Sequence, residues 1–240
     1  MAPGMPRTPG TGTTKITARG RSTRLESMTT EDPDEAARRL AAVSLAADDP
    51  TGWFERLYAA AADGAAVVPW DRGAPHPLLV DWAGGRDLGG GSALVVGFGP
   101  GFDAEFLAAR GLRTTAFDVS PSAVAAANER FPGSSVDYRT ADLLTPPPEF
   151  RQAFDLVLEV MTVQSMPPPF HPPATASVAG FVAPGGTLLV VAAAGDGDPA
   201  QAGPPWPLTR AEVDAFGRDG LRPVAVERVE QRWRAEFRHG

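Results

Sequence analysis

The chain has 240 residues, with 22 Lys and Arg residues against 29 Asp and Glu residues and a formal net charge of −7. It has no cysteine, which excludes disulfides, thiolate nucleophiles and Cys-built zinc or iron–sulfur sites. The acidic balance argues against nucleic-acid binding, no apolar run approaches the about 20 residues of a membrane span, and the three histidines lack metal-ligand spacing. We therefore expect a cytoplasmic protein without nucleic-acid, membrane or metal partners.

Residues 1–30 differ in composition from the rest. They hold five basic residues and one acid, a net charge of +4, which leaves −11 for the other 210 residues. The segment is rich in Thr, Gly and Pro and has neither apolar periodicity nor the apolar stretch of a secretory signal. We expect a disordered N-terminal tail over residues 1–30, followed by one domain over residues 31–240.

Three short helices are predicted at the start of this domain. An apolar stripe at helical spacing predicts the first, and it consists of Ala36, Leu40, Val43 and Leu45. Phe54 begins the second, and Leu78 to Trp82 form the third, which ends at Gly84. A turn-rich loop with one large aromatic, Trp70, separates the second helix from the third.

From residue 92 onward, strand and helix patterns alternate. Strands are predicted at 93–96, 114–117, 136–139, 154–160, 186–193, 224–229 and 232–237, and helices at 102–110, 120–130, 174–182 and 208–216. The last two strands follow each other closely, as in an antiparallel pair. The fold class is therefore α/β: a Rossmann-like seven-stranded, mostly parallel sheet with helices on both faces and an antiparallel C-terminal strand. Ligands of such sheets bind beyond the carboxyl ends of the strands.

A glycine-rich loop joins the first of these strands to its helix. Gly97, Gly99 and Gly101 alternate with Phe98 and Pro100, and glycine permits positive φ and close approach of the backbone to a ligand. A dinucleotide fingerprint needs its third glycine where Phe102 stands, so the spacing favours S-adenosylmethionine instead. All five residues from Gly97 to Gly101 are predicted to bind this cofactor.

Acidic residues follow the next three strands. Asp118 lies 21 residues after Gly97 and is expected to bind the ribose hydroxyls, whereas the alternative is a place in the cap of the next helix. Asp142 is expected to bind the adenine amino group, or else to be a solvated loop acid, and Glu159 to contact the site, or else to be a satisfied strand-end charge. Six residues thus join the predicted cofactor site: Trp70, Asp118, Val119, Asp142, Leu143 and Glu159.

These motifs make the chain similar, over roughly residues 50–240, to class I S-adenosylmethionine-dependent methyltransferases, and more narrowly to the thiopurine S-methyltransferase-like group. The segments that carry the narrower resemblance are Pro69-Trp70-Asp71, Asp155–Glu159 with Met166-Pro167-Pro168, Pro184-Gly185-Gly186, Pro204–Thr209 and Arg232–Arg238. The resemblance implies methyl transfer to a small-molecule acceptor, whether thiol, halide, amine or hydroxyl. Val160 and His171 stand where the group often has arginine.

No catalytic residue is assigned from the sequence. Methyl transfer is an in-line displacement in which positioning alone contributes about 7–11 kcal/mol, and a soft nucleophile requires little base. Candidate bases for other acceptors are His76, His171, Asp71 and Glu159. Two alternatives stay open: a non-catalytic cofactor-binding module and, less favoured because of Phe102, a nicotinamide-dependent oxidoreductase.

Three further expectations concern the second half of the chain. Trp206 either lines the acceptor site or packs in the core. The proline-rich run 167–173 is expected to stiffen a loop over the pocket. The arginines Arg232, Arg234 and Arg238 are expected on the solvated face of an edge strand.

Overall fold

The computed structural model describes residues 1, 4, 32–197 and 203–240. The compact unit runs over Glu31–Gly240. The predicted disordered tail, residues 1–30, lies outside the described residues apart from Met1 and Gly4, and so it stays a prediction.

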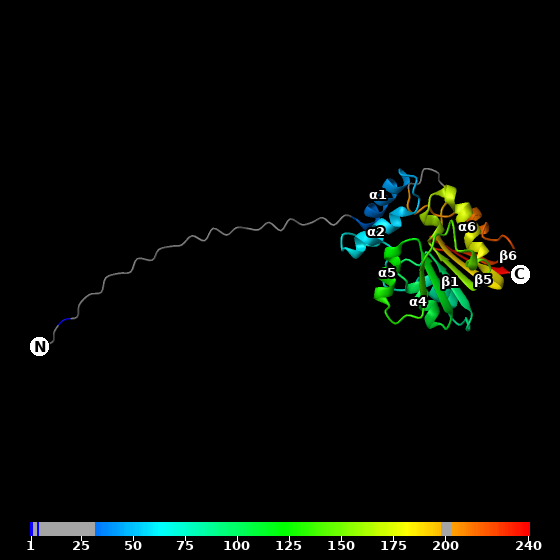
Figure 1. The fold of residues 1–240 in the computed structure, drawn as a ribbon, viewed down its shortest axis with the longest axis horizontal. Helices are drawn as coiled ribbons and strands as arrows, with labels where there is room; N and C mark the ends of the chain where they lie inside the picture. The colour runs from blue at the N-terminus through cyan, green and yellow to red at the C-terminus, as the bar shows by residue number, and fades with distance from the viewer. Residues whose placement is uncertain (2–3, 5–31, 198–202) are drawn as a thin grey trace. The chain divides into compact units, whose positions relative to one another are not determined.

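Seven strands of the described chain form one sheet in the order β3-β2-β1-β4-β5-β7-β6 (Figure 1). Their bounds are β1 Ser92–Val96, β2 Arg113–Asp118, β3 Asp137–Thr140, β4 Phe154–Val160, β5 Val182–Ala193, β6 Leu221–Val229 and β7 Arg232–His239. The first five strands are parallel, and β7 runs antiparallel to both β5 and β6. The predicted fold class is confirmed.

The place of β7 corrects one expectation. This strand lies between β5 and β6, so Arg232, Arg234 and Arg238 are on an inner strand rather than on an edge. The last two strands do pair with each other, but the hairpin adds to the sheet through its second strand. Arg232 therefore sits beside Ala193, at the carboxyl end of β5.

The helices of the described residues are α1 Pro33–Leu45, α2 Gly52–Ala62, α3 Pro77–Ala83, α4 Phe102–Ala109, α5 Pro121–Arg130, α6 His171–Gly180 and α7 Arg210–Asp214, with 3₁₀ turns η1 Pro148–Phe150, η2 Val163–Ser165 and η3 Pro168–Phe170. Their caps are local: the Ser120 hydroxyl accepts from the Ala123 amide at 3.0 Å, and Thr209 and Glu212 form the predicted capping box. No helix in this part of the chain is both long and apolar enough to cross a membrane.

Strand β1 is buried on both faces of the sheet. Leu94 and Val96 pack with α6, whereas Ala93 and Val95 pack with α4 and α5. Figure 1 shows α4 and α5 on one side of the sheet and α6 on the other. The unalternated apolar run of β1 follows from this double cover.

Two local expectations were wrong. Val43 is 56% exposed, because α1 packs its alanines, Ala37 and Ala41, against Trp53 and Leu57 of α2. The proline-rich run 167–173 is helical rather than a loop: it forms η3 and the first turn of α6. The first turn of a helix tolerates proline, because its N–H groups have no intrahelical partner there.

Candidate functional site

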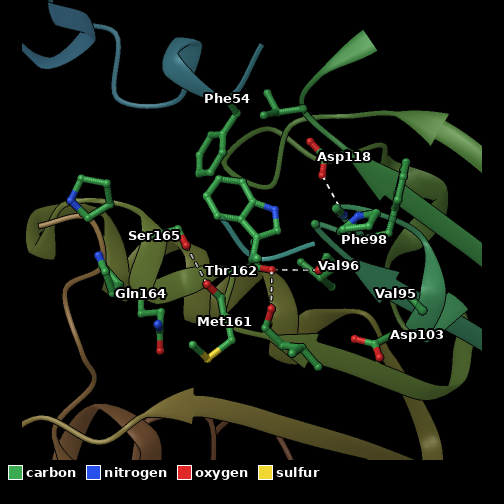
Figure 2. Close-up of a pocket in the computed structure, with 18 of the residues that line it drawn as sticks. Phe54, Val95, Val96, Phe98, Asp103, Asp118, Met161, Thr162, Gln164 and Ser165 are labelled. Atoms are coloured by element: carbon green, nitrogen blue, oxygen red, sulfur yellow. Dashed lines mark hydrogen bonds between the residues drawn. The ribbon is translucent and has the colours of Figure 1, made fainter. Parts of the chain in front are cut away.

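A cavity of about 350 Å³ opens at the carboxyl ends of β1, β2 and β4 and is closed on one side by the segment before β1 (Figure 2). Nine predicted cofactor residues line it: Trp70, Gly97, Phe98, Gly99, Pro100, Asp118, Val119, Asp142 and Leu143. Gly101 and Glu159 are not part of the lining. The structure thus brings together residues from four separate segments, three of which follow strands as predicted.

The glycine loop has the backbone conformation that its composition predicts. Gly97 and Gly99 have φ of +56° and +57°, in the left-handed region that disfavours other residues. A Cβ at Gly97 would lie 2.5 Å from the Thr162 side chain, and one at Gly99 would lie 3.2 Å from the Tyr58 hydroxyl. Both positions therefore require glycine, because φ is positive and neighbouring side chains leave little room for a Cβ. The loop thus presents its backbone to the cavity.

Asp118 ties the end of β2 to the glycine loop. Its Oδ2 accepts from the Gly99 amide at 3.1 Å and its Oδ1 accepts from the Ser120 amide at 3.0 Å. The side chain is 7% exposed, and burial raises its pKa to about 6 against the opposing effect of these hydrogen bonds. A carboxylate has about four lone-pair sites, so Asp118 retains acceptors for a ligand after serving the loop and the helix cap.

Asp142 and Leu143 follow β3 at another part of the cavity wall. Asp142 accepts from the Leu144 amide at 2.8 Å and from the Thr145 hydroxyl at 3.1 Å, which fixes the carboxylate in a half-buried position. Leu143 is buried beside it. Asp142 is thus held at the cavity rather than free in solvent.

An aromatic wall closes the N-terminal side of the cavity. The Trp70 ring meets Trp53, Phe54 and Tyr58 edge to face, with centroids 5.9, 6.3 and 6.2 Å away. Its Nε1 donates to the Tyr58 hydroxyl at 2.8 Å. Both interpretations of Trp70 are therefore met, since the ring lines the cavity and also packs against α2.

Glu159 does not reach the cavity, which corrects its predicted direct contact with a cofactor. The side chain is 0% exposed, and its Oε1 accepts from the amides of Thr162 and Val163 at 2.7 and 2.9 Å. Its Oε2 has no partner among the described residues, and burial raises its pKa to about 7. Glu159 instead holds the turn after β4, where Met161 and Thr162 line the cavity.

His76 is the one candidate base that lines the cavity, and it presents a donor. Its Nδ1 accepts from the Leu78 amide at 3.2 Å, as the cap of α3. Burial, aided by the positive charges of Arg72 and Arg232, lowers its pKa to about 4. The neutral ring therefore carries its proton on Nε2 and offers no free lone pair.

The other candidate bases lie outside the lining. Asp71 pairs with Arg130 at 2.8 Å, and the His171 ring contacts the Glu212 carboxylate at 2.7 Å and the Met166 carbonyl at 2.8 Å. Trp206 is also absent from the lining: its amide donates to the Gln164 carbonyl at 2.7 Å, and its ring packs against Gly203.

Sequence reasoning missed several lining residues, among them Phe54, Arg72, Asp103, Met161, Thr162, Gln164, Ser165 and Arg232. Met161, Thr162 and Ser165 directly follow β4, so the rule that ligands bind after strands pointed to their segment. Met161 has φ of +63°, which nothing in its residue type indicates. Arg232 reaches the cavity only because β7 inserts beside β5.

Comparisons with known proteins agree with this geometry. A family model described as a methyltransferase domain matches residues 93–186. The chain is 31% identical over 130 residues to thiocyanate methyltransferase 1 of Arabidopsis thaliana, a match that covers 52% of this chain and only 56% of that relative. It is 25% identical over 189 residues to a probable thiol methyltransferase 2 of the same plant, covering 77% and 78% of the two chains.

Solved structures show the same fold. One, reported for the conversion of a disulfide bond into a thioacetal group during echinomycin biosynthesis, has a TM-score of 0.62 at 19% identity and covers 78% of this chain and 93% of its own. The 1,6-didemethyltoxoflavin-N1-methyltransferase of Burkholderia thailandensis, solved with S-adenosylhomocysteine, has a TM-score of 0.59 at 21% identity and covers 84% and 90%. With the glycine loop, the strand order and the matched model in agreement, the chain contains a methyltransferase domain over residues 93–186 and has the fold of class I S-adenosylmethionine-dependent methyltransferases.

Proposed function

We propose that the chain binds S-adenosylmethionine in this cavity and transfers its methyl group to a small molecule with a soft nucleophilic atom, a thiol, a halide or thiocyanate. The observation that carries the proposal is the hydrogen bond between Asp118 and the amide of Gly99, which holds the glycine loop at the cavity wall. When bound, S-adenosylmethionine supplies a methyl group already activated on a sulfonium.

The donor set fits this cofactor. Asp118 has lone pairs left for two ribose hydroxyls, and Asp142 with Leu143 offers an acceptor beside an apolar surface for the adenine. The backbone of Gly97 to Pro100 would lie along the cofactor. Trp70 would close the cavity from the N-terminal side and exclude water.

The hydrogen bonding and the positions of the candidate bases support a soft acceptor. A hydroxyl or amine acceptor benefits from removal of a proton, whereas a thiol or halide needs little such help. None of the four bases predicted from the sequence offers a free lone pair to the cavity, and His76 offers an N–H instead. The curated relatives are named for thiocyanate and thiol methylation, in line with this acceptor class.

The test is an acceptor comparison with matched carbon chains. The full chain is incubated with S-adenosylmethionine and, in turn, propanethiol, propanol, propylamine, iodide and thiocyanate, and methylated product and S-adenosylhomocysteine are quantified by mass spectrometry. We expect product from the thiol, iodide or thiocyanate. Product from the alcohol or amine alone would overturn the acceptor class.

Cofactor binding without any product would favour the non-catalytic binding module. The cytoplasmic location and the absence of nucleic-acid and membrane partners stay predictions.

A further inference from the structure

Three nitrogen-bearing side chains meet at one part of the cavity, and we call them the cationic corner: Arg72, His76 and Arg232. Arg72 lies in the loop before α3, His76 caps α3, and Arg232 is the first residue of β7. Neither guanidinium group is among the proposed cofactor contacts, and neither forms an ion pair with a described residue.

The sheet register explains why these segments meet. Arg232, Arg234 and Glu236 alternate onto one face of β7. On that face, Arg234 pairs with Asp81, and Glu236 accepts from the Trp82 indole at 2.8 Å. Asp81 and Trp82 both belong to α3, so Arg232, earlier on the same face, lies toward the start of α3 and its cap.

The corner holds donors without partners. His76 is 7% exposed, and its Nε2 has no hydrogen-bond partner within the described ranges. Arg72 and Arg232 make no hydrogen bond or ion pair with any described residue, whereas nearby Arg130 and Arg234 are both paired with carboxylates. Buried polar groups are nearly always satisfied, so the unpartnered N–H of His76 on the cavity wall points to a ligand; Arg232 near it is half-buried and Arg72 is exposed.

Charges around the corner leave it positive. Asp103 is an acid in contact with it: its Oδ1 accepts from the backbone amide of His76 at 2.6 Å, and the charge of Arg72 acts on it. Asp103 thus offsets one of the two guanidinium groups. The close approach of Arg72 and Arg232 also lowers the pKa of Arg232, after the larger effect of burial.

The strand order separates the corner from the proposed adenosine residues. Asp118 ends β2 and Asp142 follows β3, on one side of the glycine loop at the end of β1. Arg232 pairs with Ala193 at the end of β5, on the other side of β1. The corner therefore faces the part of the cavity left for the acceptor.

We propose that the cationic corner binds a carboxylate that the methyl acceptor carries in addition to its nucleophilic sulfur. The inference rests on the proposed function and names its substrate class, an acidic thiol. A planar guanidinium fork matches the two oxygens of a carboxylate better than a single sulfur or halide, and His76 adds a third donor. The methionine part of S-adenosylmethionine also carries a carboxylate that could bind these donors. The experiment distinguishes the carboxylate of the acceptor from that of the cofactor.

The experiment uses the full chain saturated with S-adenosylhomocysteine. Isothermal titration compares 3-mercaptopropionate with 3-mercaptopropanamide, which has the same length and no charge. We expect the acid to bind at least tenfold more tightly than the amide. Arg72→Gln and Arg232→Gln should each remove most of this preference and leave the affinity for S-adenosylmethionine within twofold.

Two variants serve as controls for structure and general charge. Arg234→Gln removes a charge from the same face of β7 outside the cavity and should keep the preference. His76→Asn keeps an acceptor at the α3 cap but loses the reach of Nε2, and should weaken binding of the acid at least threefold without changing the melting temperature by more than a few degrees.

Equal binding of acid and amide to the wild type would overturn the inference, and methylation of propanethiol would then leave the proposed function intact. A tenfold loss of S-adenosylmethionine affinity in Arg72→Gln or Arg232→Gln would also overturn it, because the corner would then hold the cofactor's own carboxylate. If the wild type binds neither S-adenosylmethionine nor S-adenosylhomocysteine, the proposed function and the inference fall together.

Discussion

Asp118 accepts a hydrogen bond from the amide of Gly99 at 3.1 Å, so a side chain at the end of β2 fixes the backbone at the end of β1. The neighbouring strands β1 and β2 pair in parallel, with Val96 opposite Phe117, which brings their carboxyl ends together. One residue thus shapes the loop and offers lone pairs to a ligand.

Asp118→Ala should weaken S-adenosylmethionine binding by more than tenfold, about 1.4 kcal/mol or more, because it removes both the ribose acceptor and the anchor of the loop. Isothermal titration measures the affinity. Asp137→Ala is the matched control, since Asp137 is exposed on β3 and pairs with Arg139. Equal affinities in the two variants would count against the site.

Gly99→Ala should reduce both stability and cofactor binding. Its φ of +57° disfavours alanine by roughly 1 kcal/mol, and the new methyl group would press on the Tyr58 hydroxyl. Gly111→Ala is the control, because Gly111 has φ of +88° with open space around it and lies away from the cavity. Denaturation and titration should show lost stability in both variants and lost affinity only at residue 99.

Trp70→Ala should weaken S-adenosylmethionine binding about fivefold, since it removes one wall of the cavity and three edge-to-face contacts that hold this wall in place, worth about 0.5–1.5 kcal/mol each. Trp70→Phe keeps a ring and loses only the hydrogen bond to Tyr58. Its affinity should stay within threefold of the wild type. A phenylalanine variant as weak as the alanine variant would show that the hydrogen bond, rather than the wall, is what matters.

Glu159→Gln should change how stability depends on pH. Burial raises the pKa of Glu159 from 4.5 to about 7, so the folded protein holds this proton more tightly than the unfolded chain. Wild-type stability is therefore lost as pH rises from about 4.5 through 7. The glutamine variant should gain on the wild type across that window, by about 3 kcal/mol at most, at 1.36 kcal/mol per pKa unit.

Urea denaturation at pH 5, 6, 7 and 8 measures this difference. Asp155→Asn supplies a control whose effect should stay constant from pH 5 to 8, because hydrogen bonds from Ser92 lower the pKa of Asp155 from 3.8 and its contribution is lost only at pH below this range. A stability difference at residue 159 that does not vary with pH would contradict the buried, half-satisfied carboxylate.

Local signals carried most of the fold. The apolar run of β1 marked a strand covered on both faces, and Ser120 and Thr209 marked helix starts because their hydroxyls bond amides three residues on. The predictions that failed concern packing between segments distant in the sequence. Val43 has helical spacing, but the small alanines of α1 give the tighter fit against Trp53.

The same division holds for the site. The glycine loop and Asp118 lie at strand ends, where sequence order predicts proximity. Glu159 also ends a strand, yet its side chain turns away from the cavity to cap the following turn. Arg232 enters the cavity through the insertion of β7 between β5 and β6, which no local pattern of the two strands indicates.

The most direct measurement is isothermal titration of the full chain with S-adenosylmethionine, with NAD as the comparison ligand. Residue 102 is phenylalanine where a dinucleotide loop needs glycine. Comparing the two ligands therefore distinguishes an S-adenosylmethionine-binding loop from a dinucleotide-binding loop. We predict micromolar binding of S-adenosylmethionine and none of NAD. Binding of NAD alone, or of neither ligand, would contradict the proposed cofactor site.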